Sequence, residues 1–311
     1  MEIWRSLAEV PADLGPTAVV VGNFDGVHLG HQHVLARARE IADERGLSLL
    51  AVTFDPHPMA VLRPEHAPTQ LTSIERRAEL LAEAGADHVL ALPFDRDMAS
   101  WTPDEFAQRV LVDSLHAAAV VVGANFRFGS KAAGDVATLQ EFGRNHGFVA
   151  EGIPLDGGPM VWSSTYVRTC LAAGDVAGAA EALGHPYAVR GVVVRGDQRG
   201  RELGFPTANV PTDGMTAAPS DGVYAGWLRR LDTGETYPAA ISVGTNPTFD
   251  GVRERRVESY VLDRTDLDLY GVAVEVSFVD RLRGMVAFES VEKLVDQMHD
   301  DVDRARVLLS S

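Results

Sequence analysis

The spacing of apolar residues changes character about halfway along the 311-residue chain. Up to about Ile153, short β-branched runs alternate with segments of helical spacing, and this alternation is typical of a parallel sheet covered by helices. The four clearest runs span residues 18–22, 49–54, 88–92 and 119–123. We therefore predict an α/β fold, with a doubly wound, Rossmann-like N-terminal half.

Helix boundary signals accompany this alternation. The first predicted helix carries apolar residues at helical spacing, namely Val34, Leu35, Ala38, Ile41 and Ala42. Gly46 stands where a C-terminal cap is expected. Thr72 with Glu75, and Thr102 with Glu105, have the spacing of capping boxes and predict two further helix starts.

The period changes in the second half. A helical stretch over residues 163–183 ends at Gly184, and alternating segments then follow at 187–195, 222–231, 237–243, 256–262 and 272–278. Residues 232–235 have the composition of a hairpin loop. This pattern predicts a small antiparallel β-barrel, and the apolar spacing after Glu289 predicts a C-terminal helix against it. The predicted domains are residues 1–186 and 187–311.

Composition narrows the classes of function. The chain has 46% hydrophobic and 23% charged residues, and its formal charge of -16 disfavours a nucleic-acid partner. It has one cysteine, Cys170, which excludes an intramolecular disulfide. We expect no membrane span and no export signal, and hence a cytoplasmic protein with small-molecule substrates. The sequence leaves a homo-oligomer open.

The segment over residues 22–31, GNFDGVHLGH, joins the first strand to the first helix. Open α/β sheets bind ligands at such a position, where free N–H groups and the positive end of the helix dipole favour phosphate. Gly22, Gly26 and Gly30 would let the backbone approach it closely. His28 and His31 lie three residues apart at the helix start, so their rings can point into one space. The same histidines could instead cap the helix, and a metal site would need a third ligand that is not nearby in the sequence.

This block resembles the H-x-G-H signature of the nucleotidyltransferase superfamily. In its fuller form it is similar to the adenylyltransferase module of prokaryotic bifunctional riboflavin kinases/FAD synthetases. Residues 53–58 (TFDPHP), 122–129 (VGANFRFG) and 163–168 (SSTYVR) resemble that module too, and the resemblance covers most of residues 17–185.

The resemblance implies roles for particular residues of the N-terminal half. His28 and His31 would be catalytic, stabilising charge on the phosphates during nucleotidyl transfer. The residues implied to bind ATP are Gly22, Phe24, Asp25, Gly30, Ser164, Thr165 and Arg168. Those implied to bind the flavin are Pro56, His57, Pro58, Asn125 and Phe128. Asn125 departs from the pattern, since many relatives have aspartate there, although an amide can also bind a flavin or nucleotide edge.

A second group of polar residues lies in the C-terminal half. Thr207 and Asn209 are two apart in an extended segment, so their side chains project to one side and offer hard oxygen ligands. Glu258 lies in an alternating strand between Arg256 and Tyr260, which share its face. On residue type alone, an exposed strand carboxylate paired with a nearby arginine is the commoner case for a residue such as Glu258.

Residues 190–196 (RGVVVRG) and 200–209 (GRELGFPTAN) resemble the riboflavin kinase module, with coverage from about Tyr187 to Leu309. The resemblance assigns Thr207 and Asn209 to Mg²⁺ and the nucleotide phosphates. It makes Glu258 the general base for the riboflavin 5′-hydroxyl. The residues implied to bind ATP or flavin are Gly191, Gly196, Arg201, Gly204, Phe205 and Pro206.

Taken together, these resemblances imply a bifunctional flavin-cofactor enzyme that uses ATP and Mg²⁺. One half would convert riboflavin to FMN, and the other would convert FMN to FAD. Another acceptor, such as a pantetheine phosphate or nicotinamide mononucleotide, is an alternative for the N-terminal half alone. A flavin-binding protein without catalysis and a zinc hydrolase built on His28 and His31 are further alternatives.

Overall fold

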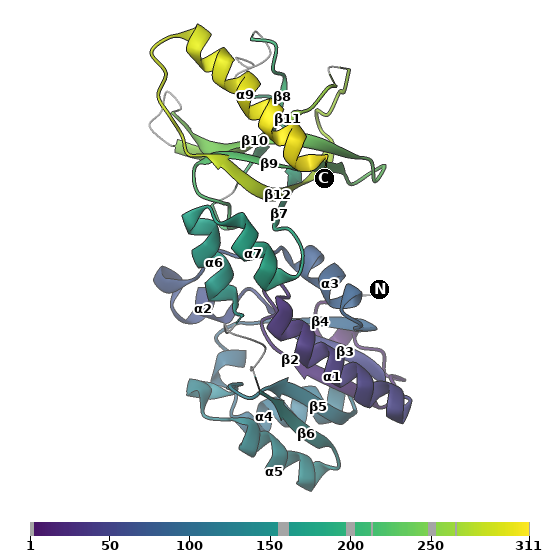
Figure 1. The fold of residues 1–311 in the computed structure, drawn as a ribbon. Coiled ribbons are helices and arrows are strands. Elements are labelled where there is room, and N and C mark those ends of the chain that lie inside the picture. The colour runs from purple at the N-terminus through teal and green to yellow at the C-terminus, as the bar shows by residue number, and fades with distance from the viewer. Residues whose placement is uncertain are drawn as a thin grey trace. The chain divides into compact units, whose positions relative to one another are not determined.

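The computed structural model describes residues 3–154, 162–196, 203–212, 214–247, 253–264 and 266–310. The chain divides into two compact units, Met1–Ser164 and Thr165–Ser311 (Figure 1). Each unit is built around its own six-stranded sheet.

The first unit contains a fully parallel sheet in the order β1-β4-β3-β2-β5-β6. Its strands are β1 (Ile3–Trp4), β2 (Thr17–Val21), β3 (Ser48–Asp55), β4 (His88–Pro93), β5 (Ala117–Gly123) and β6 (Val149–Ile153). The four predicted runs are confirmed as β2 to β5. Both faces of the sheet are apolar and buried, as expected for parallel strands covered by helices. The short β1 and β6 were missed because neither has a long β-branched run.

The order reverses between β2 and β5, so the loops after these strands open at the crevice where such sheets bind ligands. The loop after β2 ends at His28 and leads to His31 in the first turn of the next helix, and the loop after β5 carries residues 124–128. The end of β3 leads into the Asp55–Pro56 peptide, which is cis, and then into His57. The topology thus brings three of the motifs to one edge of the sheet.

Helices cover both faces of this sheet. The longer ones are α1 (Leu29–Arg45), α3 (Ile74–Glu83) and α5 (Val136–His146). Shorter helical segments are η1 (Leu7–Glu9), α2 (Pro58–Leu62), η2 (Pro64–His66), η3 (Met98–Ser100), α4 (Pro103–Phe106), η4 (Ala107–Ser114) and η5 (Ser130–Ala132). Gly46 caps α1 with φ 66°, and the Thr102–Glu105 capping box is present, as predicted.

The other predicted capping box is wrong by one residue. Ser73 is the N-cap of α3, and its hydroxyl accepts a hydrogen bond from the Arg76 backbone N–H. The Thr72 hydroxyl is engaged elsewhere, since it donates to Asp25 and accepts from the Gly26 N–H. The Thr72 hydroxyl therefore binds the buried Asp25 carboxylate instead of capping the helix.

The second unit begins with two helices where one stretch was predicted: α6 (Ser164–Ala173) and α7 (Val176–Leu183). The break falls at Gly174, whose φ of 78° favours glycine, and Asp175 caps α7 by accepting from the Gly178 N–H. Helix α7 packs against β12, and two hydrogen bonds join α6 to the same sheet and to the segment that leads into it. The Ser220 N–H donates to the Leu171 carbonyl at 2.8 Å, and Arg281 donates to the Ala173 carbonyl at 3.2 Å.

The sheet of the second unit is antiparallel, in the order β7-β12-β9-β10-β11-β8. Its strands are β7 (Ala188–Val192), β8 (Thr207–Pro211), β9 (Gly222–Arg230), β10 (Thr236–Pro247), β11 (Arg253–Val261) and β12 (Ala273–Arg283). A bridge between Val194 and Asn209 links the two edges, so the sheet is nearly closed, as the predicted barrel requires. The predicted hairpin joins β9 to β10. Helix α9 (Val291–Leu309) follows and packs on the sheet, as expected (Figure 1).

Candidate functional sites

The two histidines of the H-x-G-H segment form a stacked pair in the first unit. Their ring centroids are 3.6 Å apart with an interplanar angle of 27°, and Phe24 contacts His31 edge-on at 5.1 Å. His28 is the N-cap residue of α1, but its side chain makes no capping hydrogen bond. Both Nδ1 atoms are buried and have no hydrogen-bond partner among the described residues. The pair is therefore not explained by helix capping.

Both imidazoles resist protonation. Burial lowers the pKa of His28 from 6.5 to about 4, although the Asp25 carboxylate opposes this shift. The pKa of His31 lies well below its usual value, first because of burial and then because of His28 and the Arg77 guanidinium. Both rings are therefore neutral at pH 7 in the absence of ligand, so each can donate one hydrogen bond.

This shift predicts a pH-dependent stability of the first unit. Between pH 6.5 and about 4, His28 is protonated in the unfolded chain but stays neutral in the folded protein. The free energy of unfolding therefore falls as the pH falls through this window. The loss of unfolding free energy reaches about 3 kcal/mol for His28 alone. We expect the melting temperature of His28→Asn to decline less than that of the wild type between pH 7 and pH 5. Parallel declines would contradict the assignment of the shift to His28.

The structure gives steric and conformational reasons for the glycines of this segment, which the sequence did not reveal. A Cβ on Gly22 would lie 3.0 Å from the Phe24 ring, and one on Gly30 would lie 3.1 Å from the His28 ring. These two glycines make room for rings of the site itself. Gly26 has φ 82°, which favours glycine, whereas Phe24 and Val27 hold positive φ values of 48° and 43° without being glycine. The loop is thus held in a strained conformation, which is common at functional sites.

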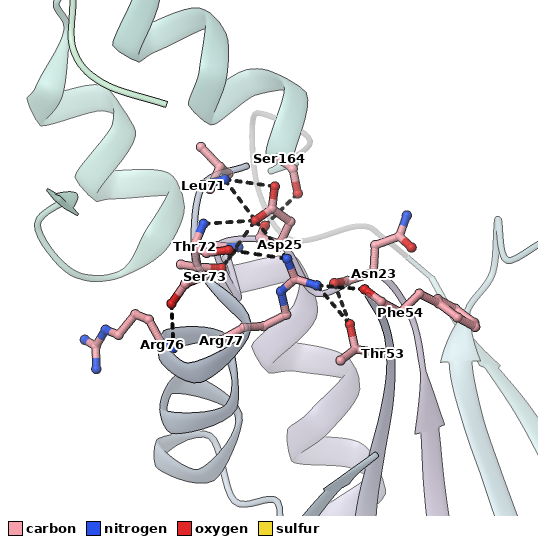
Figure 2. A network of polar contacts seen from close by, with 11 residues as sticks. Asn23, Asp25, Thr53, Phe54, Leu71, Thr72, Ser73, Arg76, Arg77 and Ser164 are labelled. Carbon is pink, nitrogen blue, oxygen red and sulfur yellow. Dashed lines mark hydrogen bonds and ion pairs between the residues drawn. The ribbon is translucent and has the colours of Figure 1, made fainter. Parts of the chain in front are cut away.

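The Asp25 side chain points toward the backbone of Leu71 and Thr72 (Figure 2). The residue is 1% exposed, and its carboxylate accepts hydrogen bonds from the N–H groups of Leu71 and Thr72 at 3.0 and 3.1 Å. Ser164 donates to its backbone carbonyl at 2.8 Å. The Asp25 carboxylate therefore shapes the loop, and its expected role in binding ATP stays a prediction.

The remaining residues expected to bind ATP lie on α6. Ser164 is the first residue of this helix, and Thr165 and Arg168 lie in its first two turns. Thr165 and Arg168 belong to the second unit, whereas Ser164 ends the first. Their role in binding the triphosphate stays a prediction.

A cavity of about 880 Å³ adjoins the loop in the first unit. Gly22, His57, Pro58 and Phe128 line it, which brings together one residue expected to bind ATP and three expected to bind the flavin. Its apolar walls come from Phe54, Phe94, Met98, Phe106 and Phe126. Pro56 is not among its lining residues, and Asn125 is exposed in the turn after β5, outside that lining. The aromatic wall was missed because its residues come from separate strands and loops.

In the second unit, Thr207 and Asn209 project from β8 as predicted. Their side chains touch, since the Asn209 amide donates to the Thr207 hydroxyl at 3.2 Å. Glu258 on β11 is paired in register with Asn209, and Tyr260 is paired with Thr207. Side chains directly opposite in an antiparallel pair have Cβ atoms about 4.5–5.5 Å apart. Glu258 is thus a neighbour of Thr207 and Asn209, although about fifty positions separate it from them in the sequence.

Thr207 and Asn209 line two cavities at once. One, of about 390 Å³, is lined by Glu258 and by apolar residues of the sheet and α9, including Phe205, Val223 and Met298. The other, of about 480 Å³, is more polar and includes Gly196, Pro206 and Arg195. An apolar chamber and a polar chamber that share a threonine and an asparagine suit a ring system on one side and phosphates on the other.

The glycines expected in this site also have steric reasons. A Cβ on Gly196 would lie 2.6 Å from Asn209 Oδ1, and one on Gly191 would lie 2.5 Å from Val210. Gly204 has φ 90°, a conformation that favours glycine. Phe205 is buried and packs edge-on against Tyr260. Arg201 lies outside the described residues.

Helix α9 contributes to the apolar chamber through Leu294, Met298 and Asp301. The Asp301 carboxylate is 3% exposed and accepts a bidentate ion pair from Arg283 at 2.7–3.0 Å. This contact fixes the helix over the chamber. Sequence reasoning placed the helix but gave no sign that it lines the site.

Comparisons with known proteins agree with two sites in two halves of the chain. Residues 10–158 match the family model described as FAD synthetase, and residues 183–309 match the one described as riboflavin kinase. A bifunctional riboflavin kinase/FMN adenylyltransferase from Escherichia coli K12 is 38% identical over 97% of this chain and 95% of its own length. The protein of the same name from Haemophilus influenzae is 35% identical over the full length of both chains.

A crystal structure titled as a macrolide-efflux protein from Streptococcus pneumoniae is similar in fold. It has a TM-score of 0.87, 32% identity, and coverage of 98% of each chain. None of the helices in the described part of the present chain combines the length and apolar character that crossing a bilayer requires. With both family models matched in order and relatives above 30% identity along nearly the whole sequence, the chain belongs to the bifunctional riboflavin kinase/FMN adenylyltransferase family.

Proposed function

We propose that the histidine pair of the first unit catalyses adenylyl transfer to FMN and that Glu258 of the second unit catalyses phosphorylation of riboflavin. The enzyme uses ATP in both steps and forms FAD from riboflavin by way of FMN. The observation that carries the residue assignment is the presence of two separate sites. The imidazole pair lies in one unit, and the group of Thr207, Asn209 and Glu258 lies in the other.

In adenylyl transfer, a phosphate oxygen of FMN attacks the α-phosphorus of ATP and pyrophosphate leaves. The step needs in-line positioning and donors for the shifting negative charge more than covalent help. His28 and His31 stand at the N-terminus of α1, where the helix dipole also favours anions. Their neutral rings can donate to phosphate oxygens, and the phosphate charge would in turn raise the pKa of each ring.

The 880 Å³ cavity is our candidate for the FMN site. Its phenylalanines provide apolar faces for the isoalloxazine ring. Arg63, Arg127 and Lys131 also line it and provide positive charge for the FMN phosphate. Because Gly22 and Asn23 lie at the same cavity, the phosphate of FMN could reach the nucleotide loop.

In the kinase step, the riboflavin 5′-oxygen attacks the γ-phosphorus of ATP, its proton passes to Glu258, and ADP leaves. Glu258 lines the apolar chamber, where the flavin ring would lie, and faces Asn209 at the border of the polar chamber. A carboxylate at that border can reach the hydroxyl at the end of the ribityl chain.

Thr207 and Asn209 are suited to hold the Mg²⁺ that accompanies the nucleotide. In this structure the Asn209 amide nitrogen donates to the Thr207 hydroxyl and carbonyl, so Asn209 Oδ1 points away from Thr207. The amide would turn over for the two side-chain oxygens to face one ion. Mg²⁺ is commonly held by few protein oxygens, with water and phosphate as the other ligands, so the lack of a His/Cys/Asp/Glu cluster among the described residues is compatible with it. When bound, the ion would neutralise phosphate charge.

The domain boundary at residues 186 and 187 also belongs to this proposal. The two compact units divide earlier, after Ser164, because α6 and α7 pack with the antiparallel sheet. The riboflavin kinase match begins at residue 183. The catalytic module and the compact unit therefore differ by these two helices.

A fragment from Tyr187 onward should phosphorylate riboflavin by itself, because all proposed kinase residues lie beyond that point. A fragment from Thr165 should have the same turnover and a higher melting temperature, since it keeps α6 and α7. The measurement is ATP- and Mg²⁺-dependent FMN formation beside thermal unfolding. Two well-folded but inactive fragments would show that the N-terminal half completes the kinase site.

A further inference from the structure

Arg77 is a buried cation that the reaction scheme above does not use. It lies on α3 with 2% of its surface exposed. Its Nη1 donates to the Thr53 hydroxyl at 3.2 Å and to the Phe54 carbonyl at 3.4 Å. Its Nη2 donates to the Thr72 carbonyl at 3.4 Å and lies 3.5 Å from the Asp25 carboxylate. Figure 2 shows the guanidinium reaching from the helix into the space between these segments.

These contacts join the loops of the two substrates. Asp25 belongs to the loop that precedes His28, whereas Thr53 and Phe54 lie near the end of β3, which leads to His57. Thr53 makes a second link, since its hydroxyl donates to the Asn23 carbonyl at 2.9 Å. One side chain thereby fixes the nucleotide loop against the segment that lines the proposed FMN cavity.

Stability alone does not explain a charged pair in this place. Removing a guanidinium and a carboxylate from water costs several kcal/mol per ion, and apolar replacements of such pairs are often as stable. The Arg77–Asp25 pair is 3% and 2% exposed at its side chains. The pair is better explained by the geometry and charge that it gives to the site.

The pair also acts electrostatically on the imidazoles. Within the first unit, the Arg77 charge lowers the pKa of His31, and the Asp25 charge raises that of His28. The neighbouring imidazole of His28 also lowers the pKa of His31. The two buried ions thus push the protonation of the pair in opposite directions.

We propose that Arg77 is a positioning residue for adenylyl transfer: its contacts hold the nucleotide loop against the flavin loop, and its buried ion pair with Asp25 fixes the loop that leads to His28. This inference rests on the proposed role of His28 and His31. It assigns no direct contact with substrate to Arg77.

Arg77→Lys tests the geometric part. A lysine keeps the charge but cannot contact Thr53, Phe54 and Asp25 with one planar group. We expect kcat for FAD formation from FMN to fall about 10- to 100-fold, as misplacement of reacting groups typically does. Riboflavin phosphorylation by the same preparation should be unchanged and reports on folding. Unchanged FAD formation in a folded Arg77→Lys protein would overturn the positioning role.

The charge part is tested by titrating the imidazole ring protons by NMR in the ligand-free full chain, with His28→Asn and His31→Asn spectra as assignments. In Arg77→Met the pair should titrate at a higher pH than in the wild type, because the cation that lowers the pKa of His31 is gone. Adding Asp25→Asn should move the titration back toward the wild-type value and also removes the uncompensated buried charge, so this double variant should fold. Titration curves that coincide in wild type, Arg77→Met and the double variant would overturn the electrostatic role. These ring titrations do not depend on turnover, so they stand even if His28→Ala and His31→Ala prove fully active.

Discussion

Replacing His28 or His31 with alanine should reduce FAD formation from FMN about 10²- to 10³-fold. In the proposed mechanism each ring donates to the phosphate on which charge develops, and losing one such donor typically costs about 3–4 kcal/mol of transition-state stabilisation. The stacked arrangement at 3.6 Å makes both rings part of one site, so the two variants should be similarly impaired.

Riboflavin phosphorylation should be nearly intact in both variants, because the kinase residues lie in the other unit. His33→Ala is a matched control, since His33 is exposed on the same helix and outside the stacked pair. The measurement is product formation from FMN and from riboflavin in parallel assays. Equal loss of both activities in a folded protein would refute the assignment of two sites.

Glu258→Gln should lower the turnover of riboflavin to FMN about 10²- to 10⁴-fold, the usual contribution of a general base. The amide is nearly isosteric with the carboxylate but cannot accept the proton of the 5′-hydroxyl. Riboflavin should still bind, as followed by quenching of its fluorescence, because the apolar wall of the chamber is unchanged. Supplied FMN should still be converted to FAD.

Glu235→Gln, in the exposed hairpin loop, provides the control for a carboxylate lost elsewhere on the same barrel. If Glu258→Gln retains near-normal kinase turnover, Glu258 is not the base. Asp263 would then be the next carboxylate along the chain, but Arg306 holds it at 2.8 Å and it does not line either chamber. A water held by magnesium would be the better candidate.

The architecture could be predicted from local patterns because its strands are short, apolar and bounded by turns. The parallel sheet could be predicted from runs such as Ala18 to Gly22, whose strand is buried on both faces. The break between α6 and α7 was missed because apolar residues continue through Gly174, and only its positive φ marks the end of the first helix. Thr72 was misplaced because a tertiary contact, its hydrogen bond with Asp25, overrides the local capping signal.

The candidate sites were predictable only as far as motifs reach. His28 and His31 lie in one motif, and their juxtaposition follows from helical spacing. That Glu258 faces Asn209 depends on the register of β11 with β8, which no sequence spacing encodes. The aromatic cavity wall, the α9 contacts and the Arg77 network are assembled from distant segments by the fold. These tertiary arrangements are where the structure adds most to the sequence.

The central claim, two successive activities in one chain, is tested most directly by a single time course. The full chain is incubated with riboflavin, ATP and Mg²⁺, and the flavins are separated at intervals. We expect riboflavin to give FMN and then FAD, with ADP from the first step and pyrophosphate from the second. Riboflavin that stays unconverted, or FMN that accumulates without FAD and pyrophosphate, would contradict it.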